Sequence, residues 1–289
     1  MYLAIISDIH SNYMALENAL CQLEGLHPDG MIFLGDYLTD FPYPQNTLRL
    51  IDECRATFPC WFVRGNREDY LLAHRRDPTD GWRYSSSSGS LLYTYENVTK
   101  DDLDRFESMP ISIDIDFAAL TGDSSLPPLS ACHASPRATK EWIMNRPALI
   151  EQRLSEVKGS ALLCGHTHRG GIAESNHKRV IFCPSVGLPQ DRRPGAKFLL
   201  LEPKRGVWRY RTYIADYDKD KMAAEFERSG LSEKAGVWAK CIIRSMYEER
   251  DFAARCVALA WRIAASEKFD GAVLPEEYWE RAARELGII

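Results

Sequence analysis

Short apolar runs alternate with amphipathic segments in the first part of this chain, and each apolar run ends in a polar turn. One amphipathic segment carries Leu16, Leu20 and Leu23 at helical spacing, and another covers residues 45–55. Strands that alternate with helices predict a mainly parallel sheet with crossover connections. The apolar runs that predict these strands lie at residues 2–6, 31–34 and 60–63.

The pattern changes after about residue 80, where strand-like runs follow one another with one helical stretch, near residues 147–157. The polar run Ser85–Ser88 predicts a loop or the beginning of a helix. We expect the later strands to form a second sheet against the first, so that residues 1–215 make one two-sheet α/β sandwich flanked by helices. These later runs lie at residues 111–115, 129–133, 161–164, 179–183, 197–202 and 207–214.

The last part of the chain is helix-like throughout residues 220–289. Trp238, Ile242 and Met246 recur there with the spacing of one helix face. We therefore predict a C-terminal helical extension over residues 216–289. Its apolar face either packs on the sandwich or makes a contact between copies of the chain, so a homo-oligomer through these helices is one expectation.

Composition and charge narrow the classes of partner. The chain is 45% apolar and 27% charged with a formal net charge of −5, which argues against a long nucleic-acid track or an anionic membrane surface. Bound metal ions would still allow phosphate substrates by adding local positive charge. The eight cysteines form no CxxC pair, and no basic leader or spanning apolar run is present. We expect free thiols and a cytoplasmic location.

Polar residues with metal-binding chemistry follow the strand-like runs in five short blocks. Their oxygen and nitrogen donors suit Mn, Fe, Zn, Ni or Co and are enough for two divalent cations. A pair of such ions can share a carboxylate and a hydroxide that attacks a phosphate ester in line. The candidate ligands are Asp8, His10, Asp36, Asn66, His133, His166 and His168.

Strand periodicity offers a reason for two of these pairs to converge. Side chains two positions apart on a strand point to the same face. We therefore expect Asp8 and His10 to project together from the first strand, and His166 and His168 to do the same after the strand at residues 161–164.

The ordered blocks resemble those of the calcineurin-like metallophosphoesterase superfamily. The residues around them look like those of the small bacterial phosphoesterases related to diadenosine tetraphosphatases. The resemblance covers residues 1–215 and implies a four-layer α/β/β/α sandwich with a dinuclear metal centre. It implies that Asp36 is the bridging carboxylate between the two ions. By the same resemblance one ion binds Asp8, His10, Asp36 and His168, and the other binds Asp36, Asn66, His133 and His166.

One position departs from the pattern of the superfamily. Many members carry a histidine after the asparagine, thought to protonate the leaving group, where this chain has Arg67. Arginine cannot act as an acid near neutrality, but its planar fork suits a substrate phosphate. The alternative is a structural arginine paired with Glu68 or another acid. Arg137 is a second candidate for substrate contact, with a structural ion pair as its alternative.

Other polar residues have plainer interpretations. We expect His27 in a solvated loop, His74 on a helix surface and His177 in a hairpin turn. Arg192 and Arg193 form either a second phosphate clamp or a solvated charge pair.

The leading hypothesis is a metal-dependent phosphoesterase that hydrolyses a phosphomonoester or phosphodiester through a metal-bridging hydroxide. Its partner would be a small phosphorylated or nucleotide-like substrate. The alternatives are a diadenosine-polyphosphate hydrolase, a Ser/Thr protein phosphatase-like activity, and a catalytically inactive scaffold of the same fold.

Overall fold

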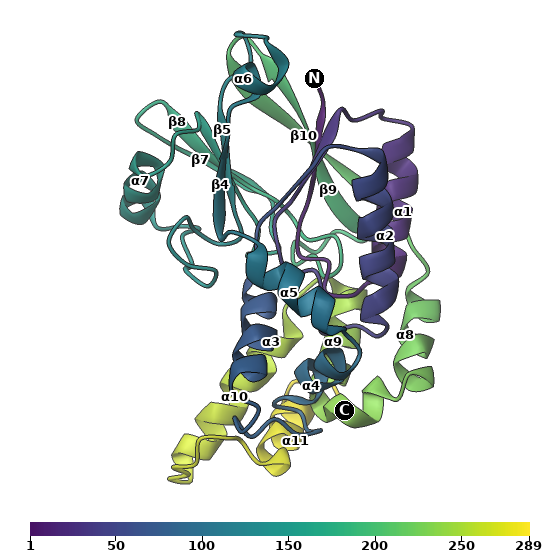
Figure 1. The fold of residues 1–289 in the computed structure, drawn as a ribbon. Coiled ribbons are helices and arrows are strands. Elements are labelled where there is room, and N and C mark those ends of the chain that lie inside the picture. The colour runs from purple at the N-terminus through teal and green to yellow at the C-terminus, as the bar shows by residue number, and fades with distance from the viewer.

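Two five-stranded sheets pack face to face in the computed structural model, which describes residues 1–289 (Figure 1). The first sheet has the order β10 (Val207–Ala215), β9 (Ala196–Lys204), β1 (Leu3–Ile6), β2 (Gly30–Phe33), β3 (Cys60–Phe62). The second has the order β4 (Ser112–Ile115), β5 (Leu129–Cys132), β6 (Ala161–Cys164), β8 (Lys178–Phe182), β7 (Gly171–Ser175).

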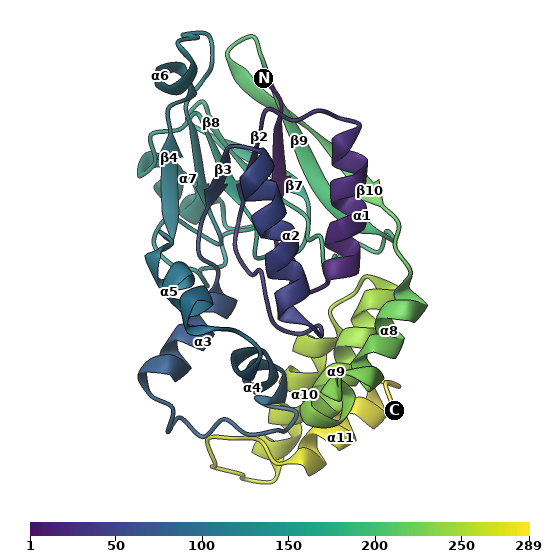
Figure 2. The same cartoon turned by 45° about the vertical axis from the view of Figure 1, so that its right-hand side comes forward.

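Helices cover the outer faces of both sheets, and a further group lies beyond one end of the sandwich (Figures 1 and 2). The first sheet is covered by α1 (Tyr13–Glu24) and α2 (Pro44–Thr57), and the second by α7 (Pro147–Ser155). A short helix, α6 (Phe117–Thr121), precedes β5. The remaining group consists of α3 (Asn66–Arg76), α4 (Gly89–Glu96), α5 (Lys100–Ser108), α8 (Lys219–Arg228), α9 (Leu231–Glu248), α10 (Phe252–Ser266) and α11 (Glu276–Glu285).

Alternation along β1 explains the layering. Leu3 and Ile5 belong to the core between the two sheets, whereas Ala4 and Ile6 belong to the core beneath α1 and α2. All four side chains are fully buried, as expected for a parallel strand covered on both faces. A third apolar cluster lies between the second sheet and α7. The predicted four-layer α/β/β/α sandwich is confirmed.

The sheets are mixed rather than mainly parallel. β1, β2 and β3 run parallel, but β9 pairs antiparallel with β1 and so completes the first sheet instead of joining the second. The two-residue turn Arg205–Gly206, with positive φ at both positions, returns the chain as β10. The sequence reading missed β7, because its side chains are half-exposed and form no apolar run.

All elements after Ala215 are helices, and they do not pack in isolation. Their apolar cluster includes Met14, Phe41, Tyr93 and Leu188 from the preceding part of the chain. The division at residue 215 stays a prediction, since the two segments share this core. None of the helices has the length and apolar character needed to cross a membrane.

The core between the sheets provides a test of this arrangement. Trp208 is 1% exposed there, and its indole Nε1 donates to the Pro127 carbonyl at 3.0 Å. We expect Trp208→Ala to lower the free energy of unfolding by about 3–5 kcal/mol, because it leaves a cavity and an unpaired carbonyl. Urea denaturation measures this loss. The control is Trp261→Ala on α10, whose side chain is 41% exposed; an equal loss in both variants would contradict the packing.

Candidate metal centre

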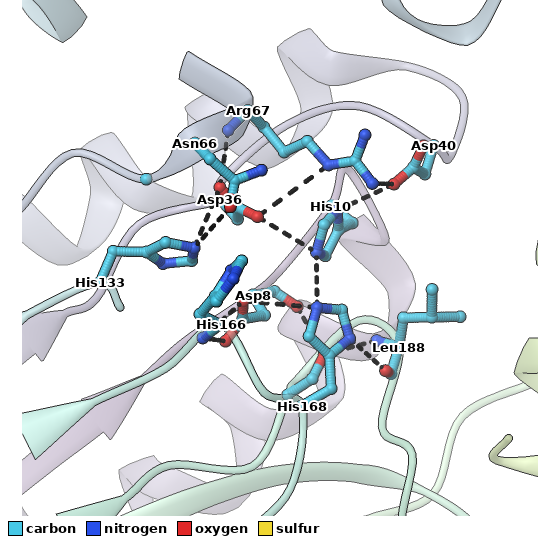
Figure 3. Close-up of polar contacts among 12 residues, drawn as sticks. Asp8, His10, Asp36, Asp40, Asn66, Arg67, His133, His166, His168 and Leu188 are labelled. Carbon is cyan, nitrogen blue, oxygen red and sulfur yellow. Dashed lines mark hydrogen bonds and ion pairs between the residues drawn. The ribbon is translucent and has the colours of Figure 1, made fainter. Parts of the chain in front are cut away.

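The seven candidate ligands meet at the carboxyl ends of strands from both sheets (Figure 3). Six of them are buried and His166 is half-buried. They arrive from five different turns of the sandwich, which is why residues far apart in sequence converge. The loop after β1 supplies Asp8 and His10, the loop after β2 supplies Asp36, α3 begins with Asn66, the residue after β5 is His133, and the loop after β6 supplies His166 and His168.

The ligand atoms fall into two groups, within each of which they lie within 4.8 Å of one another. The Asp36 carboxylate lies between the groups, with Oδ1 3.4 Å from His133 Nε2 and Oδ2 3.7 Å from His10 Nε2. Asn66 Oδ1 lies 3.1 Å from His133 Nε2 and so extends the second group. The first group is Asp8, His10 and His168, and the second is Asp36, His133 and His166.

Backbone conformation, and not strand alternation, brings the pairs together. β1 ends at Ile6 and β6 at Cys164, so both pairs lie beyond their strands and the predicted reason was wrong. Left-handed backbone is uncommon outside glycine and clusters at functional sites. Five ligands adopt it: Asp8 (φ 52°), His10 (55°), Asp36 (53°), His166 (63°) and His168 (55°).

Two glycines let the loops after β2 and β3 touch. Gly35 has φ 89°, and a Cβ built on it would lie 2.5 Å from the Gly65 nitrogen. A Cβ on Gly65 would lie 2.3 Å from the Asp36 nitrogen. Any larger side chain at either position would therefore push Asp36 away from the second group.

A buried carboxylate locks this contact. Glu68 accepts hydrogen bonds from the backbone nitrogens of Asp36 (3.0 Å), Tyr37 (2.9 Å) and Gly65 (2.9 Å). Its side chain is fully buried. Burial raises the pKa of Glu68, and the neighbouring Asp36 charge raises it further, to about 7. This role of Glu68 differs from the predicted pairing with Arg67, and it could not be predicted because a side chain that accepts from backbone nitrogens across a turn leaves no pattern in the sequence.

Three imidazoles have an outer oxygen close to Nδ1, at hydrogen-bond geometry for His133 and His168 and as an ion-pair contact for His10. His133 Nδ1 lies 2.7 Å from the Leu34 carbonyl and His168 Nδ1 lies 2.6 Å from the Leu188 carbonyl. His10 Nδ1 lies 3.1 Å from Asp40 Oδ2. An Nδ1–H held by an outer oxygen leaves the Nε2 lone pair for a metal ion, which is the usual arrangement in protein metal sites.

The Nε2 atoms of His10 and His168 face each other at 3.1 Å. If each ring donates through Nδ1, both Nε2 atoms are acceptors and repel one another at this distance. A cation between them removes that repulsion and satisfies both lone pairs. The residues present therefore fit a divalent ion at the first group.

In the second group, neighbouring charges counteract the effect of burial on the pKa values of Asp36 and His133. Burial by itself raises the pKa of Asp36, but His133 and then His10 outweigh it and hold that pKa well below its ordinary range. Burial lowers the pKa of His133, whereas Asp36 raises it to about 10. For His166, burial and then repulsion from His133 lower the pKa to about 4. The cluster thus keeps Asp36 ionised.

Arg67 lies at the edge of the cluster and is paired with Asp40, not with Glu68. Its NH2 nitrogen is 2.9 Å from Asp40 Oδ2, and its Nε is 4.0 Å from Asp36 Oδ2. Burial by itself raises the pKa of Asp40, but Arg67 and then His10 lower it to about 2. Asp40 was not among the predicted site residues. The one feature of the sequence that could have indicated it is an acidic residue four positions after Asp36.

Comparison with known proteins agrees with this geometry. The family description "Calcineurin-like phosphoesterase" matches residues 1–170. The chain belongs to the calcineurin-like phosphoesterase family. Members of this family are metal-dependent, and their activity is the hydrolysis of phosphoesters.

Individual relatives are more distant than the family. The uncharacterized protein MJ0912 of Methanocaldococcus jannaschii is 23% identical over 251 residues, which cover 81% of this chain and 95% of that protein. The hypothetical protein PH1004 of Pyrococcus horikoshii is similar in fold, with a TM-score of 0.69, 19% identity, and coverage of 86% of this chain and 98% of that chain. A metallophosphoesterase of Sphaerobacter thermophilus is similar in fold, with a TM-score of 0.64 and 21% identity. The match covers 86% of this chain and 99% of that chain.

Several residues singled out in the sequence of this calcineurin-like phosphoesterase stay outside the cluster. Arg137 pairs with Glu156 at 2.9 Å, and none of its contacts reaches the candidate ligands. His74 was expected on a helix surface but is 6% exposed, with its ring stacked on Trp82 at 4.1 Å. His177 lies in the predicted hairpin turn, between β7 and β8.

The Glu68 lock yields a stability prediction. Glu68→Ala should lower the free energy of unfolding of the metal-free protein by about 3 kcal/mol or more, because three buried N–H groups lose their acceptor at once. Glu68→Gln keeps one acceptor oxygen and should lose less. Chemical denaturation at pH 7 measures both, with the exposed pair-forming Glu53→Ala on α2 as control. Equal stability of Glu68→Ala and the control would contradict this role.

Proposed function

We propose that this chain hydrolyses phosphate esters with two divalent cations held by the seven clustered residues. Asp8, His10 and His168 would hold one ion. Asp36, between the two groups, would serve both. The observation that supports the proposal most directly is the 3.1 Å approach of the His10 and His168 Nε2 atoms. Beside them lies the Asp36 carboxylate, with its oxygens 3.4 Å from His133 Nε2 and 3.7 Å from His10 Nε2. The second ion would be held by Asn66, His133 and His166.

The metal pair would supply an activated water as nucleophile and neutralise charge on the phosphoryl oxygens. The residues of this chain add orientation and one fixed positive charge. Arg67 stays protonated near neutral pH. Its Nε is buried without a hydrogen-bond partner and lies on the side of Asp36, so we assign it to a phosphoryl oxygen of the substrate. We no longer assign Arg137 to substrate, since Glu156 occupies its guanidinium.

The proposed substrate is a small phosphorylated or nucleotide-like molecule. A phosphomonoester, a phosphodiester and a dinucleoside polyphosphate all present the same phosphoryl group to such a centre, and parallel assays on the three classes separate them. The scaffold alternative receives no support from the cluster, because every one of the seven positions carries a donor.

The bridging position gives the first test. We expect Asp36→Asn to lose one of the two ions and to reduce kcat on bis(p-nitrophenyl) phosphate by at least about 1000-fold, since a neutral amide cannot offset charge on both ions. Metal content is measured by atomic emission, and turnover is measured with added Mn²⁺. The control is Asp52→Asn, an exposed residue of α2. A wild type without metal or turnover would reject the enzyme hypothesis.

The arginine at position 67 gives the second test. Because arginine cannot donate a proton to the departing oxygen, the rate of the chemical step should depend steeply on the leaving group. Aryl esters of falling phenol pKa should react increasingly faster than alkyl esters. Arg67→His should flatten this dependence, whereas Arg76→His at the other end of α3 should not. If chemistry is shown to limit the rate and the wild-type rate does not depend on the leaving group, the hypothesis that Arg67 leaves the departing oxygen without a proton donor is refuted.

A further inference from the structure

Trp238 of α9 links the C-terminal helices to the candidate metal centre. Its Nε1 donates to Asp40 Oδ1 at 2.8 Å. The other oxygen of Asp40 lies 3.1 Å from His10 Nδ1 and 2.9 Å from the Arg67 guanidinium (Figure 3). Asp40 is only 1% exposed, so these contacts are shielded from water. A chain of two contacts therefore joins α9 to a candidate ligand.

The ring of Trp238 also restrains Arg67 directly. The Arg67 guanidinium carbon lies 5.9 Å from the Trp238 ring and 6.0 Å from the Tyr70 ring. Cation–π contacts of this kind are worth about 0.5–2 kcal/mol each, more when water is excluded. Asp40 contacts one edge of the guanidinium. The two rings therefore restrain the orientation of the other edge, where Nε has no hydrogen-bond partner.

A break in α9 places Trp238 in this position. Gly236 has φ 52° and ψ −125°, a conformation that interrupts the helix and that side-chain-bearing residues rarely adopt. The break frees the Val237 nitrogen, which donates to Ser86 Oγ at 2.8 Å. Ser86 is held in turn by Glu276 of α11, at 2.7 Å through its nitrogen and 2.6 Å through its hydroxyl. Ser86 therefore holds the break in place through these hydrogen bonds.

A second tryptophan of the same helical group lies beside the first. Trp279 of α11 meets the Trp238 ring edge-on, with centroids 6.2 Å apart. Its own Nε1 donates to Ser87 Oγ at 3.2 Å. The two tryptophans thus lie side by side and differ in what their indole nitrogens bind, Asp40 for Trp238 and Ser87 for Trp279.

We propose that Trp238 is a positioning residue of the active site, which makes the C-terminal helices part of that site. Through Asp40 it fixes the ring of His10, and through its face it fixes Arg67. The residues matched by the family end at 170, so this contribution comes from outside the matched segment. The inference rests on the proposed function, because positioning matters only if His10 binds metal and Arg67 meets substrate.

The test uses the full-length protein with Trp238→Phe, which keeps a ring but removes the indole donor, and Trp279→Phe as matched control. Co²⁺ affinity is measured by absorbance titration, and kcat and KM are measured on bis(p-nitrophenyl) phosphate. We expect Trp238→Phe to weaken Co²⁺ binding about 10-fold, the low end for loss of a residue that orients a ligand. Trp238→Ala should in addition raise KM, because Arg67 loses its ring. Trp279→Phe should change neither quantity.

A double-mutant cycle separates positioning from general packing. If Trp238 acts through Asp40, Trp238→Phe should not weaken Co²⁺ binding further in an Asp40→Ala background. Urea midpoints identify any variant that is merely unstable. A wild type that binds metal and turns over, with a Trp238→Phe variant indistinguishable from Trp279→Phe, would overturn this inference alone. A wild type that neither binds Co²⁺ nor hydrolyses the ester would overturn the proposed function as well.

Discussion

The Asp36 carboxylate, held between two groups of imidazoles, is the interaction on which the rest of the structure depends. A buried carboxylate costs several kcal/mol unless charges and donors compensate it. The His133 and His10 Nε2 atoms lie 3.4 and 3.7 Å from its oxygens, and the backbone nitrogen of Arg67 donates to Oδ1 at 2.8 Å. Much of the surrounding architecture, from the paired glycine turns to the Glu68 lock, serves to hold this one group where both sides can reach it.

Holding the cluster together also requires an uncommon backbone. Five of its residues adopt left-handed conformations, each at a cost of about 1–3 kcal/mol. Such conformations persist only where the surroundings determine them. Here the loops are anchored on strands buried on both faces, such as β1 and β2. The two packed sheets thus supply the rigidity, and the loops between them supply the chemistry.

Local pattern was sufficient to predict every strand except β7, the covering helices and the set of candidate ligands, because apolar periodicity and ordered polar blocks are properties of adjacent residues. It failed where contacts join distant segments. The sheet to which β9 belongs is decided by pairing with β1, not by its own residues. The roles of Asp40, Glu68 and Trp238 were missed for the same reason: each acts through a partner 27 or more positions away, or through backbone groups.

The return of β9 to the first sheet bears on how the protein is made. Leu3 pairs with Leu201. The first strand to be synthesised, β1, therefore gains its second neighbour only after nearly two hundred more residues have been made. Until then β1 presents an open edge, which is prone to pairing with other chains. A product that stopped at residue 170, where the family match ends, would carry all seven donors but would lack β9, one of the two neighbours of β1. The segment that contains all the candidate ligands is therefore shorter than the segment needed to complete the first sheet.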